Sequence, residues 1–256
     1  MDTFVKKSLP SYENTADTFL FSGNLTKALI NYQKAKTLDP TNAILLNKLG
    51  VTYERLNNLK EAEKNYLQAI KLDKTYREPV HNLALLYQKQ ENPTKAVRYF
   101  KRAIIFDKTH FSSYVGLAQC LSQINKLSEA ISAYTIALTL RPGSVDIRQE
   151  IASLSTTLGN WKEARKSYTF ILKLHPTDPH VWGNLALMYK QEGKLDLALS
   201  SLLKAVSLDH TLPHLHYALA VIYHDLGKPV EAMNHIEKAY VLDPSLKEDY
   251  LNLLKN

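Results

Sequence analysis

Seven histidines in the last third of the chain are the side chains most able to do chemistry: His175, His180, His210, His214, His216, His224 and His235. His180 and His214 lie 34 residues apart, a spacing that could bring them together around a metal ion in a repeating chain. No third ligand accompanies them, so we predict no metal site. His216 falls at a packing position and is expected in the core. The sequence also lacks a phosphate-binding glycine loop, a GxSxG motif and an HExxH motif. We therefore predict a protein that is not an enzyme and holds no cofactor.

A row of asparagines is the second feature with chemical capacity. Asn14, Asn82, Asn184 and Asn252 are separated by 68, 102 and 68 residues, all multiples of 34. A side-chain amide both donates and accepts hydrogen bonds, so such a row along a groove could pair with the main chain of an extended peptide. Lys48, Gly116, Glu150 and Ala218 interrupt the row. The alternative, that the asparagines are ordinary polar residues of a wet helix face, stays open.

These residues lie in a sequence that repeats every 34 residues, in seven copies from Leu9 to Leu246. The structure of this repeat must therefore position them. The twentieth place is alanine in every copy, and the eighth place is alanine or glycine. Large residues recur at the eleventh and twenty-fourth places, except at Ser155. Two small residues twelve apart allow two antiparallel helices to approach closely, and the large residues fill the space between helices. The pattern predicts a first helix over roughly the second to fourteenth residues of each copy and a second over the eighteenth to thirty-first.

The spacing of Trp182, Leu185, Ala186, Tyr189, Ala198 and Ala205 resembles the tetratricopeptide repeat. The resemblance implies an all-α fold, an α-solenoid with a right-handed superhelix of seven helix-turn-helix repeats and a C-terminal capping helix. The expected segments are an N-terminal extension (1–8), seven repeats (9–42, 43–76, 77–110, 111–144, 145–178, 179–212 and 213–246) and the capping helix (247–256). First helices would line a concave groove, and second helices would form the convex back.

The resemblance implies that six places of each repeat line the groove: the second, fifth, sixth, ninth, twelfth and thirteenth. In this chain these places carry seven acidic and four basic residues, a charge of 4 − 7 = −3 in a chain of net charge +7. The acidic set is Glu13, Asp17, Glu54, Glu78, Asp146, Glu150 and Asp225. The positive excess therefore falls on the back and edges, chiefly on the second helices of the second and third repeats, where Arg98, Lys101 and Arg102 form a candidate basic patch. An RNA-binding repeat protein would need its positive charge in the groove, so nucleic acid is disfavoured as a partner.

The sixth and seventh repeats combine apolar and polar groove residues, which could supply affinity and register for a bound segment. The candidate site comprises Asn184, Leu187, Lys190, Tyr217, Val221 and His224. A second choice in the third repeat comprises Asn82, Leu85 and Gln88. No three consecutive first helices supply the lysine, arginine and asparagine pattern of the carboxylate clamp, so an adaptor for acidic chaperone tails is not expected.

We therefore predict a non-enzymatic scaffold or adaptor that binds a protein or peptide partner in the groove. The alternative is a regulatory or targeting module that docks an enzyme or a membrane-associated assembly through its basic back, and a distant third is an RNA-associated repeat protein. Self-association stays open. The single cysteine, Cys120, is expected in the core, and the sequence has neither a signal peptide core nor a transmembrane segment, so a cytoplasmic location is expected.

Overall fold

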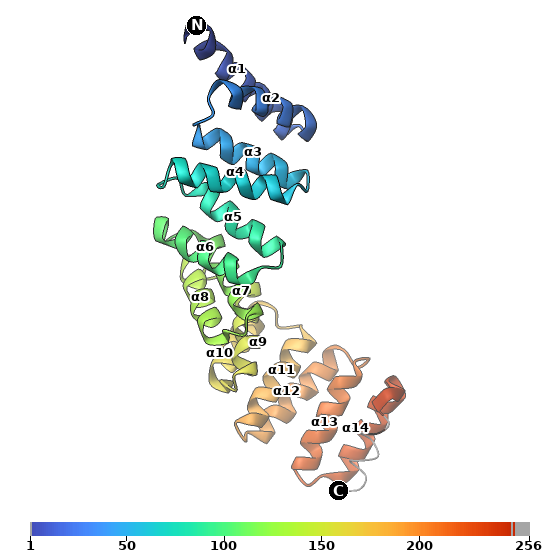
Figure 1. The fold of residues 1–256 in the computed structure, drawn as a ribbon. Helices are drawn as coiled ribbons and strands as arrows, with labels where there is room; N and C mark the ends of the chain where they lie inside the picture. Colours follow the sequence, from blue (N-terminus) through green and yellow to red (C-terminus); the bar gives the residue numbers. More distant parts are fainter. Residues whose placement is uncertain (1, 247, 249–256) are drawn as a thin grey trace. The chain divides into compact units, whose positions relative to one another are not determined.

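The computed structural model describes residues 2–246 and 248. The chain divides into two compact units, an N-terminal unit (Met1–Arg141) and a C-terminal unit (Pro142–Asn256). Within the described residues, fourteen α-helices follow one another, and none of these residues forms a strand (Figure 1). The N-terminal unit contains α1 (Asp2–Phe21), α2 (Leu25–Leu38), α3 (Ala43–Arg55), α4 (Leu59–Leu72), α5 (Glu78–Lys89), α6 (Pro93–Phe106), α7 (Phe111–Gln123) and α8 (Leu127–Leu140). The C-terminal unit contains α9 (Val145–Thr157), α10 (Trp161–Leu174), α11 (Pro179–Gln191), α12 (Leu195–Leu208), α13 (Pro213–Asp225), α14 (Pro229–Leu242) and a short 3-10 helix, η1 (Pro244–Leu246).

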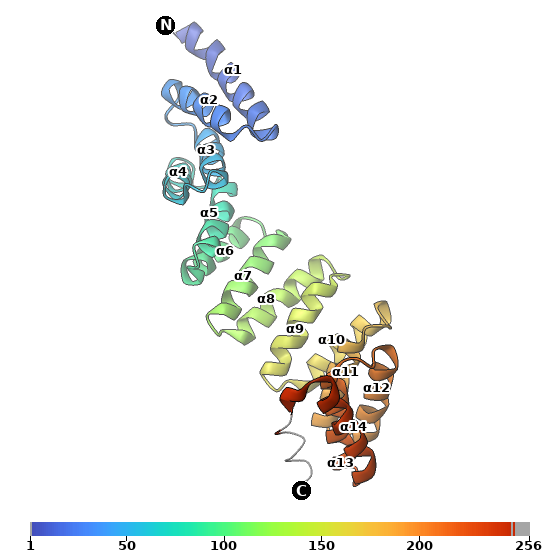
Figure 2. The same cartoon turned by 90° about the vertical axis from the view of Figure 1, so that its right-hand side faces the viewer.

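Each helix pair contains the two helices of one predicted repeat, as α7 and α8 show in Figure 2. The corner between them is set by the fifteenth place, where all seven residues have a positive φ of 55° to 79°. Four of the seven are glycine, and the other three are Asn57, Glu91 and Asn125. The asparagine that follows in the first three repeats caps the second helix, because its side chain accepts a hydrogen bond from a backbone N–H in the first turn. A left-handed residue followed by a cap therefore ends one helix and begins the next.

The turn between successive repeats is marked in the sequence by a recurring aspartate, which we did not predict. An aspartate at the thirty-first place accepts hydrogen bonds from the backbone N–H of the residue two positions later, in five repeats. These aspartates are Asp39, Asp73, Asp107, Asp209 and Asp243. In Asp73, Asp107, Asp209 and Asp243, hydrogen bonds from the side-chain hydroxyl of that later residue, and then from its backbone N–H, lower the pKa of the carboxyl below its usual value. Such an Asx-turn gives the chain a fixed exit from each repeat.

The core of each unit lies between helices, where the predicted small residues pack. All seven alanines at the twentieth place are at most 2% exposed. Tyr32, Tyr66 and Phe100, at the twenty-fourth place, are fully buried, and so is Cys120. Ser155 stands where other repeats carry a large residue, and its buried hydroxyl has no hydrogen-bond partner among the described residues. The packing pattern and the helix pairs confirm the predicted α-solenoid fold class.

The segments predicted at the two ends of the chain are described only in part. Helix α1 begins at Asp2, so residues 2–8 of the predicted N-terminal extension continue the first helix. The predicted capping helix (247–256), which includes Asn252, lies outside the described residues except for Glu248. Within each unit, first helices of successive repeats contact one another: α3 with α5 and α5 with α7 in the N-terminal unit, and α11 with α13 in the C-terminal unit.

Candidate functional site

Four of the six residues predicted in the sixth and seventh repeats converge on one hollow, which we call the apolar pocket. Leu187 and Lys190 reach it from α11, and Tyr217 and Val221 reach it from α13. The hollow has a volume of about 210 Å³ and is completed by Gly183, Ala186, Leu202, Ala218 and Ile222. Residues three or four apart share one face of a helix, which is why these side chains meet. Small residues on both helices leave the space open.

The leucine is the most available apolar surface of this pocket. Leu187 is 43% exposed although it lies between two packed helices. Gly183 keeps the helices close, because a Cβ atom added there would lie 2.8 Å from Cδ2 of Leu215. The pocket therefore offers a preformed apolar surface that a partner side chain could cover.

Lys190 and His224, which we predicted as polar groove residues, both lie near Asp225. Lys190 Nζ lies 3.0 Å from Oδ2 of Asp225, so its charge is already paired across α11 and α13. His224 is not among the residues that line the pocket, and its Nδ1 atom lies 3.9 Å from Oδ1 of Asp225. The ion pair leaves the carbon chain of Lys190 as the part that lines the pocket.

Asn184 lines a different hollow, which we call the acidic pocket. This hollow has a volume of about 590 Å³ and lies along the exposed face of α9. Its lining consists of Asp146, Gln149, Glu150, Ser153, Thr156, Thr157, Tyr168 and Asn184. The six residues from α9 occupy the six groove places predicted from the family. Helix α11 therefore faces the acidic pocket through Asn184 and the apolar pocket through Leu187, one turn further along.

Asp146 and Glu150 differ from the other five groove acids. Glu13 and Asp17 both lie 2.7 Å from Nζ of Lys48. The remaining three also have partners: Glu54 accepts from the Tyr66 hydroxyl, Glu78 pairs with Arg77, and Asp225 pairs with Lys190. Asp146 and Glu150, in contrast, have no ion pair or side-chain hydrogen bond with any residue that the structure describes, and the same holds for the amide of Asn184. The free charge of the C-terminal unit's groove is thus negative.

The three predicted residues of the third repeat are not brought together. Asn82 lines a hollow of about 260 Å³ in the N-terminal unit, but Leu85 and Gln88 do not line it. The Asn82 amide donates to Oδ1 of Asn47 at 3.0 Å, and Gln88 donates to Gln119 at 2.9 Å. Leu85 is 39% exposed. The Asn82 amide N–H and the Gln88 side chain are therefore engaged within the protein.

A histidine cluster beside Asn82 was missed by the sequence analysis. His81 and His110 both place Nδ1 against the hydroxyl of Ser113, at 3.0 and 2.8 Å. Burial and then the neighbouring His110 lower the pKa of His81 to about 4. The only sequence signal was that these two histidines lie in the same repeat, at its fifth and last places.

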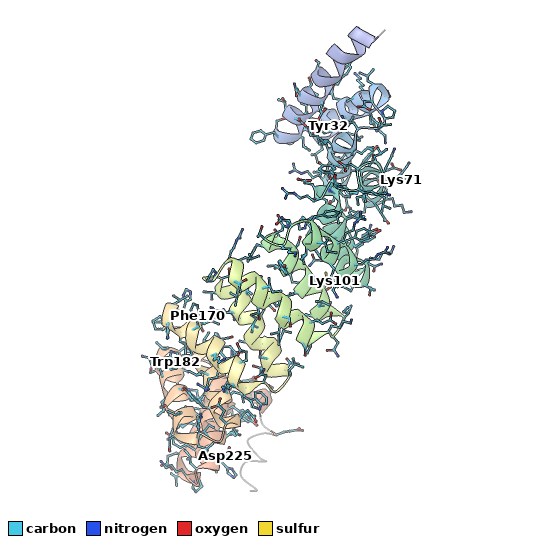
Figure 3. All side chains as sticks on the ribbon, turned by 90° about the vertical axis from the view of Figure 1, so that its left-hand side faces the viewer. Tyr32, Lys71, Lys101, Phe170, Trp182 and Asp225 are labelled. Atoms are coloured by element: carbon cyan, nitrogen blue, oxygen red, sulfur yellow. The ribbon has the colours of Figure 1, made fainter. Side chains whose placement is uncertain are left out.

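The predicted convex patch lies on α6, which carries four basic residues and no acidic one. Lys101, labelled in Figure 3, pairs with Glu129 at 3.2 Å. Arg98 and Arg102 lie over the rings of Tyr99 and Phe106, respectively, and have no ion pair within the described part of the chain. Ile105 on the same helix is 75% exposed. This surface combines free positive charge with exposed apolar area.

Comparison with known proteins decides which family has this architecture. Models described as "TPR repeat" match residues 16–57 and 186–227, and models described as "Tetratricopeptide repeat" match residues 43–76, 81–145 and 213–246. Together they cover most of the chain. This chain belongs to the tetratricopeptide repeat family. A comparison with curated protein sequences gave no match.

Solved structures of tetratricopeptide repeat proteins share this fold at low sequence identity. The C-terminal part of a repeat-containing protein from Cytophaga hutchinsonii has a TM-score of 0.72 and 17% identity, over 94% of this chain and 98% of that one. A tetratricopeptide repeat protein from Parabacteroides merdae has a TM-score of 0.61 and 21% identity, over 98% of this chain and all of that one. YrrB, described as a TPR protein with an unusual peptide-binding site, has a TM-score of 0.62 and 21% identity, over 76% of this chain and 98% of that one.

The described residues form neither a metal cluster nor a membrane span. No group of three or more histidine, cysteine, aspartate or glutamate side chains there could hold a metal ion. His180 and His214 do meet, with stacked rings whose centroids lie 5.5 Å apart. None of the described helices combines the length and the apolar character needed to cross a membrane.

Proposed function

We propose that this tetratricopeptide repeat protein is a non-enzymatic scaffold or adaptor that binds a short linear segment of a partner protein in the groove of its C-terminal unit. The observation that carries the proposal is the apolar pocket, in which Leu187, Tyr217 and Val221 surround an open hollow on the groove side of α11 and α13. The partner's apolar side chain enters this pocket, and the free amide of Asn184 pairs with its main chain. Membership of a family of interaction repeats supports this proposal, as does the peptide-binding site named for YrrB.

Pocket size and exposure support a segment rather than a flat interface. A hollow of about 210 Å³ suits a single large apolar side chain and is smaller than most sites for drug-sized ligands. Covering Leu187 and filling the pocket removes apolar area from water, which contributes roughly 1 to 3 kcal/mol per buried side chain. The amide of Asn184 would add register without demanding a particular sequence at that point.

The test is a pull-down of partners with the full chain, followed by mass spectrometry. An Asn184→Ala, Leu187→Glu double variant should lose the partner, since it removes the free amide and places a charge at the pocket. Leu203→Glu is the control, because Leu203 on α12 is 44% exposed and does not line the apolar pocket. Helicity of all variants is compared by circular dichroism. A partner retained by the double variant would refute the groove site, and recovery of the chain itself would identify self-association.

A second candidate function uses the convex patch on α6. Arg98 and Arg102 have no ion pair within the described residues, and Ile105 beside them is 75% exposed, so an acidic surface of an enzyme or assembly could dock there. The triple variant Arg98→Glu, Lys101→Glu and Arg102→Glu separates the two functions. If this variant loses the partner and the Leu187→Glu variant keeps it, the binding surface is the convex patch on α6 and not the groove. Binding of RNA at physiological salt would support the third class instead.

A further inference from the structure

The groove of the C-terminal unit carries negative charge that nothing in the described structure neutralises. Asp146 and Glu150 stand four residues apart on α9, so that both carboxylates lie on one face. They line the same hollow as the unpaired amide of Asn184. Like charges at this spacing disfavour a helix, and the chain as a whole has a net charge of +7. Two uncompensated acids beside an open apolar pocket are therefore a distinctive feature of this groove.

In the N-terminal unit, a lysine neutralises two groove acids of the same repeat fold. Lys48 occupies the sixth place of its repeat, and its ammonium lies 2.7 Å from both Glu13 and Asp17. The sixth place of the fifth repeat holds Glu150 instead of a lysine, so charge is added there rather than removed. A positively charged ligand would neutralise Asp146 and Glu150, as Lys48 neutralises Glu13 and Asp17.

We propose that the occupant of this groove, granted the peptide-binding function above, is an extended segment that carries both an apolar and a basic side chain. The apolar side chain fills the apolar pocket at Leu187, Tyr217 and Val221. A lysine or arginine lies against Asp146 and Glu150, where its charge is complementary. Asn184, between the two hollows on α11, pairs with the main chain that joins them.

The distance between the two hollows sets the spacing of these side chains. Neighbouring packed helices lie roughly 8 to 10 Å apart, and an extended chain advances about 3.3 Å per residue. Crossing from α9 to the pocket between α11 and α13 therefore takes about three to five residues. Acidic segments are disfavoured, because they would meet Asp146 and Glu150 without a cation nearby.

The experiment is a selection of random twelve-residue peptides displayed on phage, with the immobilised full chain as bait. Phage that also bind the Leu187→Glu variant are removed, so that only pocket-dependent peptides remain. We expect lysine or arginine to be enriched about three to five residues from a large apolar residue. A synthetic peptide of this kind should bind the Asp146→Asn, Glu150→Gln variant roughly tenfold more weakly, since two exposed ion pairs are lost. Its affinity for the wild type should also fall with added salt.

Controls separate the charge preference from the groove itself. Asp196→Asn, Glu237→Gln neutralises two exposed acids on α12 and α14, outside both hollows, and should leave affinity unchanged. Pocket-dependent peptides without basic enrichment, or with equal affinity for the Asp146→Asn, Glu150→Gln variant, would overturn the charge preference and leave the proposed groove function standing. Recovery of no pocket-dependent peptide would overturn both.

Discussion

His216 and His235 face each other between α13 and α14, with their Nδ1 atoms 3.1 Å apart. Nε2 of His216 lies 3.0 Å from the carbonyl oxygen of His210, which can only accept, so Nε2 carries a proton. Neutral His216 therefore has a bare Nδ1, and His235 must donate to it from its own Nδ1–H. With both rings neutral, the pair fixes one tautomer on each ring.

Acid should loosen the seventh repeat. Burial and then the neighbouring His216 and Lys238 lower the pKa of His235 to about 4, against 6.5 for an ordinary histidine. The folded pKa lies below the unfolded one, so the stabilisation is complete above about pH 6.5 and is lost as pH falls toward 4. We expect a loss of about 1 kcal/mol between about pH 7 and pH 5, since the ring is partly exposed. Hydrogen exchange of the amides of α13 and α14 measures it.

The control for this prediction is His235→Gln, whose amide can still donate to His216 and does not titrate in this range. This variant should lose most of the acid dependence in α13 and α14 while the helices of the N-terminal unit keep theirs. Equal protection factors at both pH values in the wild type, after correction for the pH dependence of the intrinsic exchange rate, would contradict the prediction.

Removing Lys48 should destabilise the first repeats. Burial lowers the pKa of Lys48, but the hydrogen bonds to Asp17 and Glu13 outweigh this effect and the pKa is raised. Lys48→Met leaves both carboxylates without their cation, at a cost of about 1 to 2 kcal/mol for these partly exposed groups. Lys64→Met removes a more exposed pair with Glu61 and should cost less than about 0.5 kcal/mol. Urea unfolding compares them, and equal effects would rule out a special role for Lys48.

Replacing the alanine at the twentieth place by a larger residue should destabilise the protein. Ala96 is fully buried, so Ala96→Leu must push α6 away from its neighbours and should cost about 1 to 3 kcal/mol. Thr94→Leu, two residues earlier on an exposed site, should change stability by less than about 0.5 kcal/mol. Thermal unfolding distinguishes them. A neutral Ala96→Leu would contradict the assigned register.

Gly50 should be intolerant even of alanine. A Cβ atom there would lie 2.5 Å from Cε1 of Tyr66, whose hydroxyl is held by Glu54. The clash should outweigh the gain of about 1 kcal/mol in helix propensity, so Gly50→Ala is expected to lower the unfolding temperature. Gly143→Ala meets no atom within 4 Å and serves as the control. Combining Gly50→Ala with Tyr66→Leu should restore part of the loss, and a failure to do so would place the strain elsewhere.

The fold could be predicted from the sequence because its packing rule repeats. Alanine at one place and a large residue four places later specify a helix contact, and seven copies make that local rule visible. The convergence of Leu187, Lys190, Tyr217 and Val221 was predictable for the same reason, because each pair occupies groove places on one face of its helix, α11 or α13, and the repeat places these two helices side by side.

The state of each polar group was not predictable, because it depends on a partner from another repeat. Lys190 is paired with Asp225 and Asn82 with Asn47, each pair 35 residues apart, and a list of groove places treats all four as free. Asp146 and Glu150 look like the other groove acids in sequence, and only the absence of partners among the described residues separates them. The start of α1 at Asp2 was also missed, since helix can continue upstream of a repeat without any periodic signal.

The burial of Cys120 has a practical consequence for measuring motion. The side chain is fully buried in α7, and burial raises the pKa of its thiol to about 11, so the native state presents little thiolate to a reagent. Since the chain has one cysteine, every labelling event reports an opening of the fourth repeat. The rate at which a thiol reagent consumes Cys120 thus counts those openings without any introduced label, and a change in that rate on adding a peptide to the C-terminal unit would measure communication along the repeats.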